Sequence, residues 1–365
     1  MPLHFVYSHQ DFITNVCRAD GSSSCVAPTP TKFDTILQAG WKDRMDRGFF
    51  RYHLSDVETR ILPGPHKFVT QLNVKRAQEK RKPQEILSVQ QEFNDKLFNF
   101  NKINPEEIIF EAMKDAGWGP GALENGKLQQ PCRMSVMVNV SPLEFGHCLL
   151  VPDLEHCLPQ VLTAFAIQVG IESVLLSSNP GFHVGFNSLG ALASVNHLHL
   201  HVYYLNHELR LESASLEPLL PEKGFYRLTD FPIGFMFYTE LDCVEKVASV
   251  VCQVTDFLVA GNVAHNLFMT RGCPPNDRMQ NEMERASRAG VRIAVWPRKS
   301  CFGVKDQSAF NIALCELAGH LLFKNKQDFD LTSEEHIIGI IQKYLLPDAE
   351  FSSLEQQLTH YLRDA

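Results

Sequence analysis

Three histidines occupy alternate positions in one short segment of the chain. From residue 196 to residue 202 the sequence reads Asn-His-Leu-His-Leu-His-Val, which places His197, His199 and His201 between apolar residues. A period of two is typical of a β-strand whose two faces differ in polarity. The pattern predicts that the three imidazoles point to one side of a strand, while the leucines and the valine anchor it in a core.

Imidazoles crowded in this way fit phosphate chemistry, metal binding or a purely structural role. A neutral imidazole, with an unperturbed pKa of about 6.5, can attack phosphorus and form a bond that transfers readily. Histidines at this spacing are also frequent zinc ligands, which carboxylates usually orient. Residues 173–207 contain no Asp, Glu, Lys or Arg. A metal site would need partners from elsewhere, and these residues alone leave the three roles open.

The elements around the histidines must hold them in place. Residues 134–140 and 148–151 are rich in β-forming residues and are joined by turn residues, which predicts a hairpin. Apolar residues at helical spacing predict a helix over 158–169. Residues 182–186 and 197–205 are predicted to be strands that bring the histidines back to the same sheet.

A second block of the chain repeats this order more weakly. Strands are predicted over 266–270, 292–296 and 314–323, followed by a helix over 337–346 whose apolar residues fall on one face. The sequence therefore predicts two related α+β halves that share one sheet.

The chain is expected to divide into three parts. Residues 1–30 contain three consecutive serines and two prolines near their end, which predicts a loosely ordered leader. Residues 31–208 form the half that carries the histidines, and residues 209–365 form the second half with C-terminal helices. The basic run at 75–82 is predicted to be a solvated face.

Composition excludes several classes of function. With 44% hydrophobic and 21% charged residues the chain is typical of a folded globular protein, and its net charge of −8 gives no basic field for a nucleic acid. The ten cysteines contain no CxxC pair, so we expect neither a disulfide framework nor a zinc ribbon. The N-terminal residues do not resemble a secretory signal, and no membrane span is predicted. We expect a cytoplasmic enzyme.

The triple histidine resembles the signature of the histidine-triad superfamily, which is His-φ-His-φ-His-φ-φ with φ apolar. Residues 197–203 match it, with Tyr203 in the last position, and residues 138–152 resemble the hairpin that precedes the signature in that superfamily. The resemblance implies an α+β fold in which helices flank an antiparallel sheet.

Further segments resemble the GDP-sugar phosphorylase branch of this superfamily, which includes GDP-L-galactose phosphorylases of plants and GDP-D-glucose phosphorylases of animals. The resemblance covers about residues 33–346, with the most similar segments at 49–52, 68–73, 98–102, 145–152, 265–271, 292–298 and 315–321. The neighbouring galactose-1-phosphate uridylyltransferases usually carry Gln in place of the third histidine and often bind zinc. This chain keeps His201 and lacks their cysteine pair.

The resemblance assigns the nucleophile and its neighbours. His199, the middle histidine, would attack the α-phosphorus, with His197 beside it. The transferring group carries charge on its non-bridging oxygens, so fixed donors are needed around it, and His201 and Ser194 are the nearest candidates. Neither a metal nor another cofactor is implied.

The remaining candidate residues would bind the substrate. His147 and Asn187 belong to the supporting shell in the family pattern. Asn139 stands where the family usually has an acidic residue that holds the ribose hydroxyls, and an amide can both accept and donate there. Arg298 and Lys299 follow a predicted strand, where a loop would present them to the sugar phosphate or to inorganic phosphate; two solvated charges are the alternative reading.

The resemblance implies a two-step reaction with GDP-hexose and inorganic phosphate as substrates. His199 would take the guanylyl group, hexose 1-phosphate would leave, and phosphate would accept the group as GDP. Overall resemblance favours the animal GDP-D-glucose type. The alternatives are a dinucleoside polyphosphate hydrolase or phosphorylase of the same superfamily, and a noncatalytic guanine-nucleotide binding or exchange module. No nucleic acid or membrane partner is expected, and the oligomeric state stays open.

Overall fold

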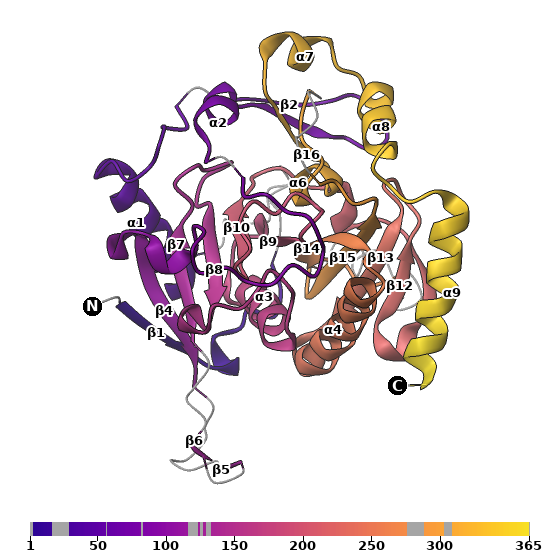
Figure 1. Ribbon diagram of the computed structural model, residues 1–365, viewed down its shortest axis with the longest axis horizontal. Helices are drawn as coiled ribbons and strands as arrows, with labels where there is room; N and C mark the ends of the chain where they lie inside the picture. Colours follow the sequence, from indigo (N-terminus) through magenta and orange to yellow (C-terminus); the bar gives the residue numbers. More distant parts are fainter. Residues whose placement is uncertain are drawn as a thin grey trace.

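A large, mostly antiparallel sheet runs through the molecule (Figure 1). The computed structural model describes residues 3–16, 29–55, 57–81, 83–115, 123–124, 127–128, 133–275, 288–302 and 309–364. Within these ranges eleven strands form the sheet, in the order β1 (Leu3–Tyr7), β4 (Ile108–Lys114), β7 (Met134–Val138), β8 (Cys148–Pro152), β10 (Leu200–Tyr204), β9 (Phe182–Asn187), β14 (Ala264–Gly272), β15 (Gly290–Arg298), β13 (Gly234–Thr239), β12 (Phe225–Leu228) and β11 (Leu216–Leu220). Strands β1 and β4 pair in parallel, and the other neighbours in this sheet run antiparallel.

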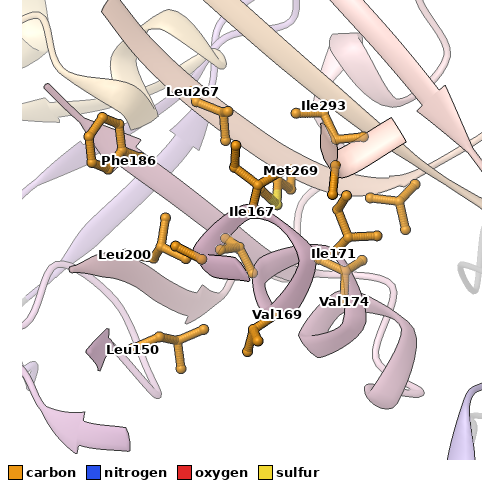
Figure 2. Close-up of a cluster of buried hydrophobic side chains, with 14 of the residues drawn as sticks. Leu150, Ile167, Val169, Ile171, Val174, Phe186, Leu200, Leu267, Met269 and Ile293 are labelled. Carbon is orange, nitrogen blue, oxygen red and sulfur yellow. The ribbon is translucent and has the colours of Figure 1, made fainter. Parts of the chain in front are cut away.

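Helices cover one face of this sheet. They are α1 (Lys32–Asp46), α3 (Ala164–Leu176), α4 (Val244–Ala260) and α9 (Asp348–Asp364). Thr163 caps the N-terminus of α3, and the helix buries Ile167 and Ile171 against side chains of the central strands. Figure 2 shows these residues beside Leu200 of β10 and Met269 of β14. Burial of this apolar surface fixes the central strands on which the histidines depend.

A smaller layer covers the opposite face. It consists of the three-stranded sheet β16 (His320–Phe323), β3 (Val69–Leu72) and β2 (Glu58–Ile61), and of the helices α2 (Val74–Glu79), α6 (Leu314–Leu317), α7 (Lys326–Leu331) and α8 (Glu334–Gln342). Along β10, Leu200 and Val202 pack in the helix-covered core and Tyr203 packs in the core of the smaller layer. His201 therefore lies on the face of the smaller layer. A short hairpin, β5 (Leu123–Glu124) with β6 (Lys127–Leu128), stands apart.

The expected fold class is confirmed, and two predicted strands differ from the structure. The predicted strand over 197–205 enters the ladder only at Leu200. The predicted strand over 314–323 is divided into α6 and β16. Gly319 lies between them with a φ of +99°, a left-handed conformation that suits glycine. Strand β16 then pairs in parallel with β3 instead of joining the large sheet.

The N-terminal residues are more ordered than a loose leader. Residues 3–7 form β1 at the edge of the large sheet, and Phe5, Tyr7 and Phe12 are buried against it. The alternation of Phe5 and Tyr7 with exposed residues is the signal of a half-buried strand, which the serines and prolines nearer residue 30 obscured. Residues 17–28 of the predicted leader lie outside the described residues.

Three further observations concern the described ranges alone. No helix there is long and apolar enough to cross a lipid bilayer. Seven cysteines lie in these ranges and all are free thiols, while Cys17, Cys25 and Cys132 fall outside them. Among the same residues, His, Cys, Asp and Glu side chains do not gather in groups of three or more that would hold a metal ion.

Candidate active site

A cavity lies between the large sheet and the smaller layer, at the point where β10 begins. It contains about 1380 Å³ of space between atoms, part of it open to solvent. Five of the residues singled out from the sequence line it together: His199, His201, Asn139, Asn187 and Ser194. They come from different loops and strands, so the fold brings together groups that are up to about 60 residues apart in the chain.

The side chain of Gln160 holds the backbone of His199. Its Oε1 accepts the His199 N–H at 2.9 Å, and its Nε2 donates to the His199 carbonyl at 3.2 Å and to the Asn187 carbonyl at 3.0 Å. A neighbouring strand would make the same pair of bonds, but His199 precedes the ladder of β10. Gln160, itself 1% exposed, thus fixes the position of His199 from the loop before α3.

One ring nitrogen of His199 forms a hydrogen bond that determines the tautomer of the ring. Nδ1 lies 2.7 Å from the carbonyl oxygen of His197. Because a carbonyl can only accept, Nδ1 carries the proton, and Nε2 keeps its lone pair. Burial lowers the pKa of His199 to about 4, so the ring is neutral at neutral pH. His199 is therefore prepared to act as a nucleophile through Nε2.

His147 determines the tautomer of His201 in the same way. The Leu143 N–H donates to His147 Nδ1 at 2.9 Å, so the proton of the neutral His147 ring is on Nε2. That nitrogen lies 3.1 Å from His201 Nδ1 and donates to it. The His201 proton is then on Nε2, at the opposite edge of a ring that lines the cavity. Burial, followed by the charge of neighbouring histidines, holds the pKa of both rings well below the usual value.

Asn139 completes this group of side chains. Its Oδ1 accepts the Ser141 N–H at 3.0 Å, which fixes the orientation of the amide. Its Nδ2 lies 3.3 Å from His147 Nε2, and since both atoms are donors, the His147 proton goes to His201. Asn139 lines the cavity from the end of β7, whereas His147 lies behind His201.

His197 does not share the cavity with the other two histidines. Its Nδ1 accepts the Phe100 N–H at 3.2 Å, and its ring packs between Phe93 and Phe100 with ring centroids 5.4 Å apart in each case. The sequence predicted three imidazoles on one side of a strand. Leu198 packs in the same core as Leu200 and Val202, and the rings of His197 and His199 both contact Phe100, so the predicted alternation already holds before the ladder begins. The contribution of His197 to His199 is its backbone carbonyl.

Arg298 and Lys299 do not line the cavity. Strand β15 continues as far as Arg298, so this residue is not on a loop but is buried, with its guanidinium stacked over Tyr344 at 5.1 Å. It donates to Asn266 at 3.3 Å and to the carbonyl of Ile312. Lys299 is exposed and its Nζ lies 3.4 Å from the Lys343 carbonyl. These two residues connect elements of the second half.

Cations that the sequence reasoning missed do line the cavity: Arg76, Lys80, Arg81 and Lys324. The first three belong to the basic run that was predicted to be a solvated face. Asn73 caps α2 by accepting the Arg76 N–H at 3.0 Å, and the Arg76 guanidinium donates to the Ser141 carbonyl. The available signal in the sequence was Asn73. Asparagine is a favoured N-cap residue, so it predicts that a helix begins directly after it and carries Arg76 in a defined orientation.

Family models match nearly the whole chain. The model described as GDPGP1-like, N-terminal domain, matches residues 32–203, and the one described as GDPGP1-like, C-terminal domain, matches residues 212–365. "GDP-D-glucose phosphorylase 1" of Danio rerio is 53% identical over 97% of both chains. The protein of that name from Homo sapiens is 46% identical over 97% of this chain and 90% of its own.

More distant proteins share the fold. "GDP-L-galactose phosphorylase 2" of Arabidopsis thaliana is 28% identical over 90% of this chain and 76% of its own length. The crystal structure of the yeast Ap4A phosphorylase Apa2 superposes with a TM-score of 0.56 at 14% identity, covering 87% of this chain and 98% of that one. The expected kinship with the GDP-sugar phosphorylases is confirmed, and the chain belongs to the GDPGP1-like family.

Proposed function

We propose that this protein is a GDP-D-glucose phosphorylase, which converts GDP-glucose and inorganic phosphate into GDP and glucose 1-phosphate. Support comes from relatives that carry this name and are 46–53% identical over nearly the full chain. The observation that carries the chemistry is the position of His199, which lines a cavity with a neutral ring and an available Nε2.

In the first step His199 Nε2 attacks the α-phosphorus of GDP-glucose. A bond forms between Nε2 and phosphorus, and the bond from phosphorus to the bridging oxygen breaks. The electron pair leaves with that oxygen as glucose 1-phosphate. The imidazole becomes positively charged, and the His197 carbonyl, which accepts from Nδ1, stabilises this charge.

In the second step an oxygen of inorganic phosphate attacks the same phosphorus. The bond to Nε2 breaks, the electron pair returns to the ring, and GDP is formed. The acceptor must approach from the side that glucose 1-phosphate has left, because displacement at phosphorus is in line. The same histidine and the same donors therefore serve both steps.

Fixed donors stabilise the charge on the non-bridging oxygens during both displacements. His201 presents an N–H whose direction is set by His147, and its ring centroid lies 5.0 Å from that of His199. Arg76 adds a guanidinium that is anchored through the Ser141 carbonyl. Ser194 and Lys324 also line the cavity.

In this proposal the two parts of the chain have different roles, and the reacting histidines belong to residues 31–208. The second half, residues 209–365, supplies α6 to the wall of the cavity. The Leu314 N–H donates to Asn187 Oδ1 at 3.0 Å, and Asn266 Nδ2 donates to the same atom at 2.6 Å. The two halves would thus complete one site instead of forming two.

The proposal is tested by offering the purified protein GDP-, UDP- and ADP-glucose, each with and without phosphate. We expect GDP and glucose 1-phosphate from GDP-glucose only when phosphate is present. Release of free GMP would instead show a hydrolase. Absence of turnover with every nucleotide sugar would contradict an enzymatic function and favour a binding module.

Replacing Gln160 by methionine tests how His199 is positioned. Methionine has a similar length but cannot bond to the His199 backbone. We expect kcat to fall about 100-fold, because a displacement of about 1 Å at a reacting atom has that effect. Gln357 is exposed on α9 and provides a matched control, Gln357→Met. Equal rates for the two variants at equal Tm would show that the backbone bonds of Gln160 do not matter for catalysis.

A further inference from the structure

The two ends of the cavity differ in chemistry. One end is apolar, with Phe100, Ile103, Met137 and Leu149 on its wall. The other end is polar, with Asn187, Asn311, Glu316 and Lys324. An apolar slot suits a planar base, whereas hydroxyl groups and phosphate require donors and acceptors.

The strand order places these ends on opposite sides of the nucleophile. Glu107 directly precedes β4 and Asn139 directly follows β7, both on one side of β10. Asn187 ends β9, and α6 packs on β9 and β14, on the other side. Strand β4 is three strand spacings from β10, which is about 14 Å. Across the sheet, this separation between β4 and β10 accommodates a base and a ribose.

Two opposite charges line the apolar end of the cavity. Glu107 belongs to the single turn Pro105–Glu107, where its Oε1 accepts the Asn104 N–H at 3.2 Å. Arg81 has its guanidinium stacked over Phe98, 3.3 Å from the ring centroid. Burial raises the pKa of Glu107 and lowers the pKa of Arg81, so both charges are partly removed from water. Groups desolvated in this way discriminate strongly between donors and acceptors on a ligand.

We propose that Glu107 and Arg81 select guanine as the base of the substrate. The carboxylate of Glu107 accepts from N1–H and the 2-amino group, while the guanidinium of Arg81 donates to O6. Adenine presents an acceptor at N1 and a donor at its 6-amino group, so both contacts would become repulsive. This inference rests on the proposed function and adds to it the residues that read the base.

The assignment also orients the whole substrate. With guanine between β4 and β7, the ribose lies near Asn139 and the α-phosphorus lies at His199. The hexose phosphate then extends toward Asn187 and α6, where the cavity is polar. The order of groups in an extended GDP-hexose is thus the order of the strands across the sheet.

The variant Glu107→Gln tests the proposal with GDP-, IDP- and ADP-glucose as substrates. IDP-glucose lacks only the 2-amino group. For the unmodified protein we expect kcat/KM to be about 10- to 100-fold lower with IDP-glucose than with GDP-glucose, the cost of one hydrogen bond to a charged group. In Glu107→Gln this preference should shrink to a few-fold, with the loss for GDP-glucose expressed mainly in KM.

Glu106→Gln is the matched control. Glu106 is adjacent and exposed, and it does not line the cavity, so the variant should keep the full preference. Glutamine at position 107 retains the oxygen that accepts the Asn104 N–H, so the local turn should persist, and the Tm of both variants checks this. An unchanged preference for GDP-glucose over IDP-glucose in Glu107→Gln would overturn the base assignment. Lack of phosphorolysis by the unmodified protein would instead overturn the proposed function.

Discussion

Replacing His199 by alanine is expected to abolish guanylyl transfer, with kcat reduced by at least about 10⁴-fold. A covalent nucleophile has no substitute when its neighbours are misplaced. Residues two apart on an extended chain are displaced by about 6–7 Å, and the in-line geometry tolerates far less. His201 therefore cannot attack the phosphorus in place of His199, although their ring centroids are 5.0 Å apart.

The control for this variant is His336→Ala. His336 is exposed on α8, so its replacement should leave kcat and Tm unchanged. The rate of glucose 1-phosphate release in a single turnover is the appropriate measurement, because it isolates the first step. Near-normal release by His199→Ala would contradict the proposed mechanism, while family membership would be unaffected.

Replacing His201 and His197 by alanine is expected to have unequal effects. His201→Ala removes a donor with a fixed direction, and the loss of one such donor lowers kcat by about 100- to 1000-fold. His197→Ala keeps the carbonyl that orients His199 and loses one bond from the Phe100 N–H. This loss should reduce kcat by about tenfold or less.

The comparison separates a backbone role from a side-chain role for His197. Single-turnover rates of the two variants, measured beside their Tm values, provide the test. If His197→Ala lost as much activity as His201→Ala without a loss of stability, the His197 ring would have a catalytic role that its position beside Phe93 and Phe100 does not explain.

The segment of the proposed nucleophile and its strand were predictable because their signals are local. The alternation around His199 depends only on neighbouring residues, and the anchoring of Leu200 and Val202 in the core follows from the period of two. The hairpin that carries Asn139 and His147 was predictable from β-rich segments joined by turn residues.

The parts that were not predicted depend on contacts between distant segments. The ring of His197 turns toward Phe100, which is 97 residues away in the chain, and no local pattern contains that information. Arg76 and Arg81 belong to a basic run, and a run of charges is the same in sequence whether it faces solvent or a cavity. No local pattern in the sequence indicated that Gln160 would bond to the backbone of His199, or that Glu107 would be a candidate for contacting the base.

The direct test of the account is the site of the covalent intermediate. The unmodified protein is incubated with GDP-glucose in the absence of phosphate, and the product is mapped by mass spectrometry of its peptides. We expect one guanylyl group per chain on His199, labile to acid and stable to mild base as a phosphoramidate is, and discharged as GDP when phosphate is added. A guanylyl group on His197 or His201, or turnover without any guanylylated protein, would contradict the mechanism.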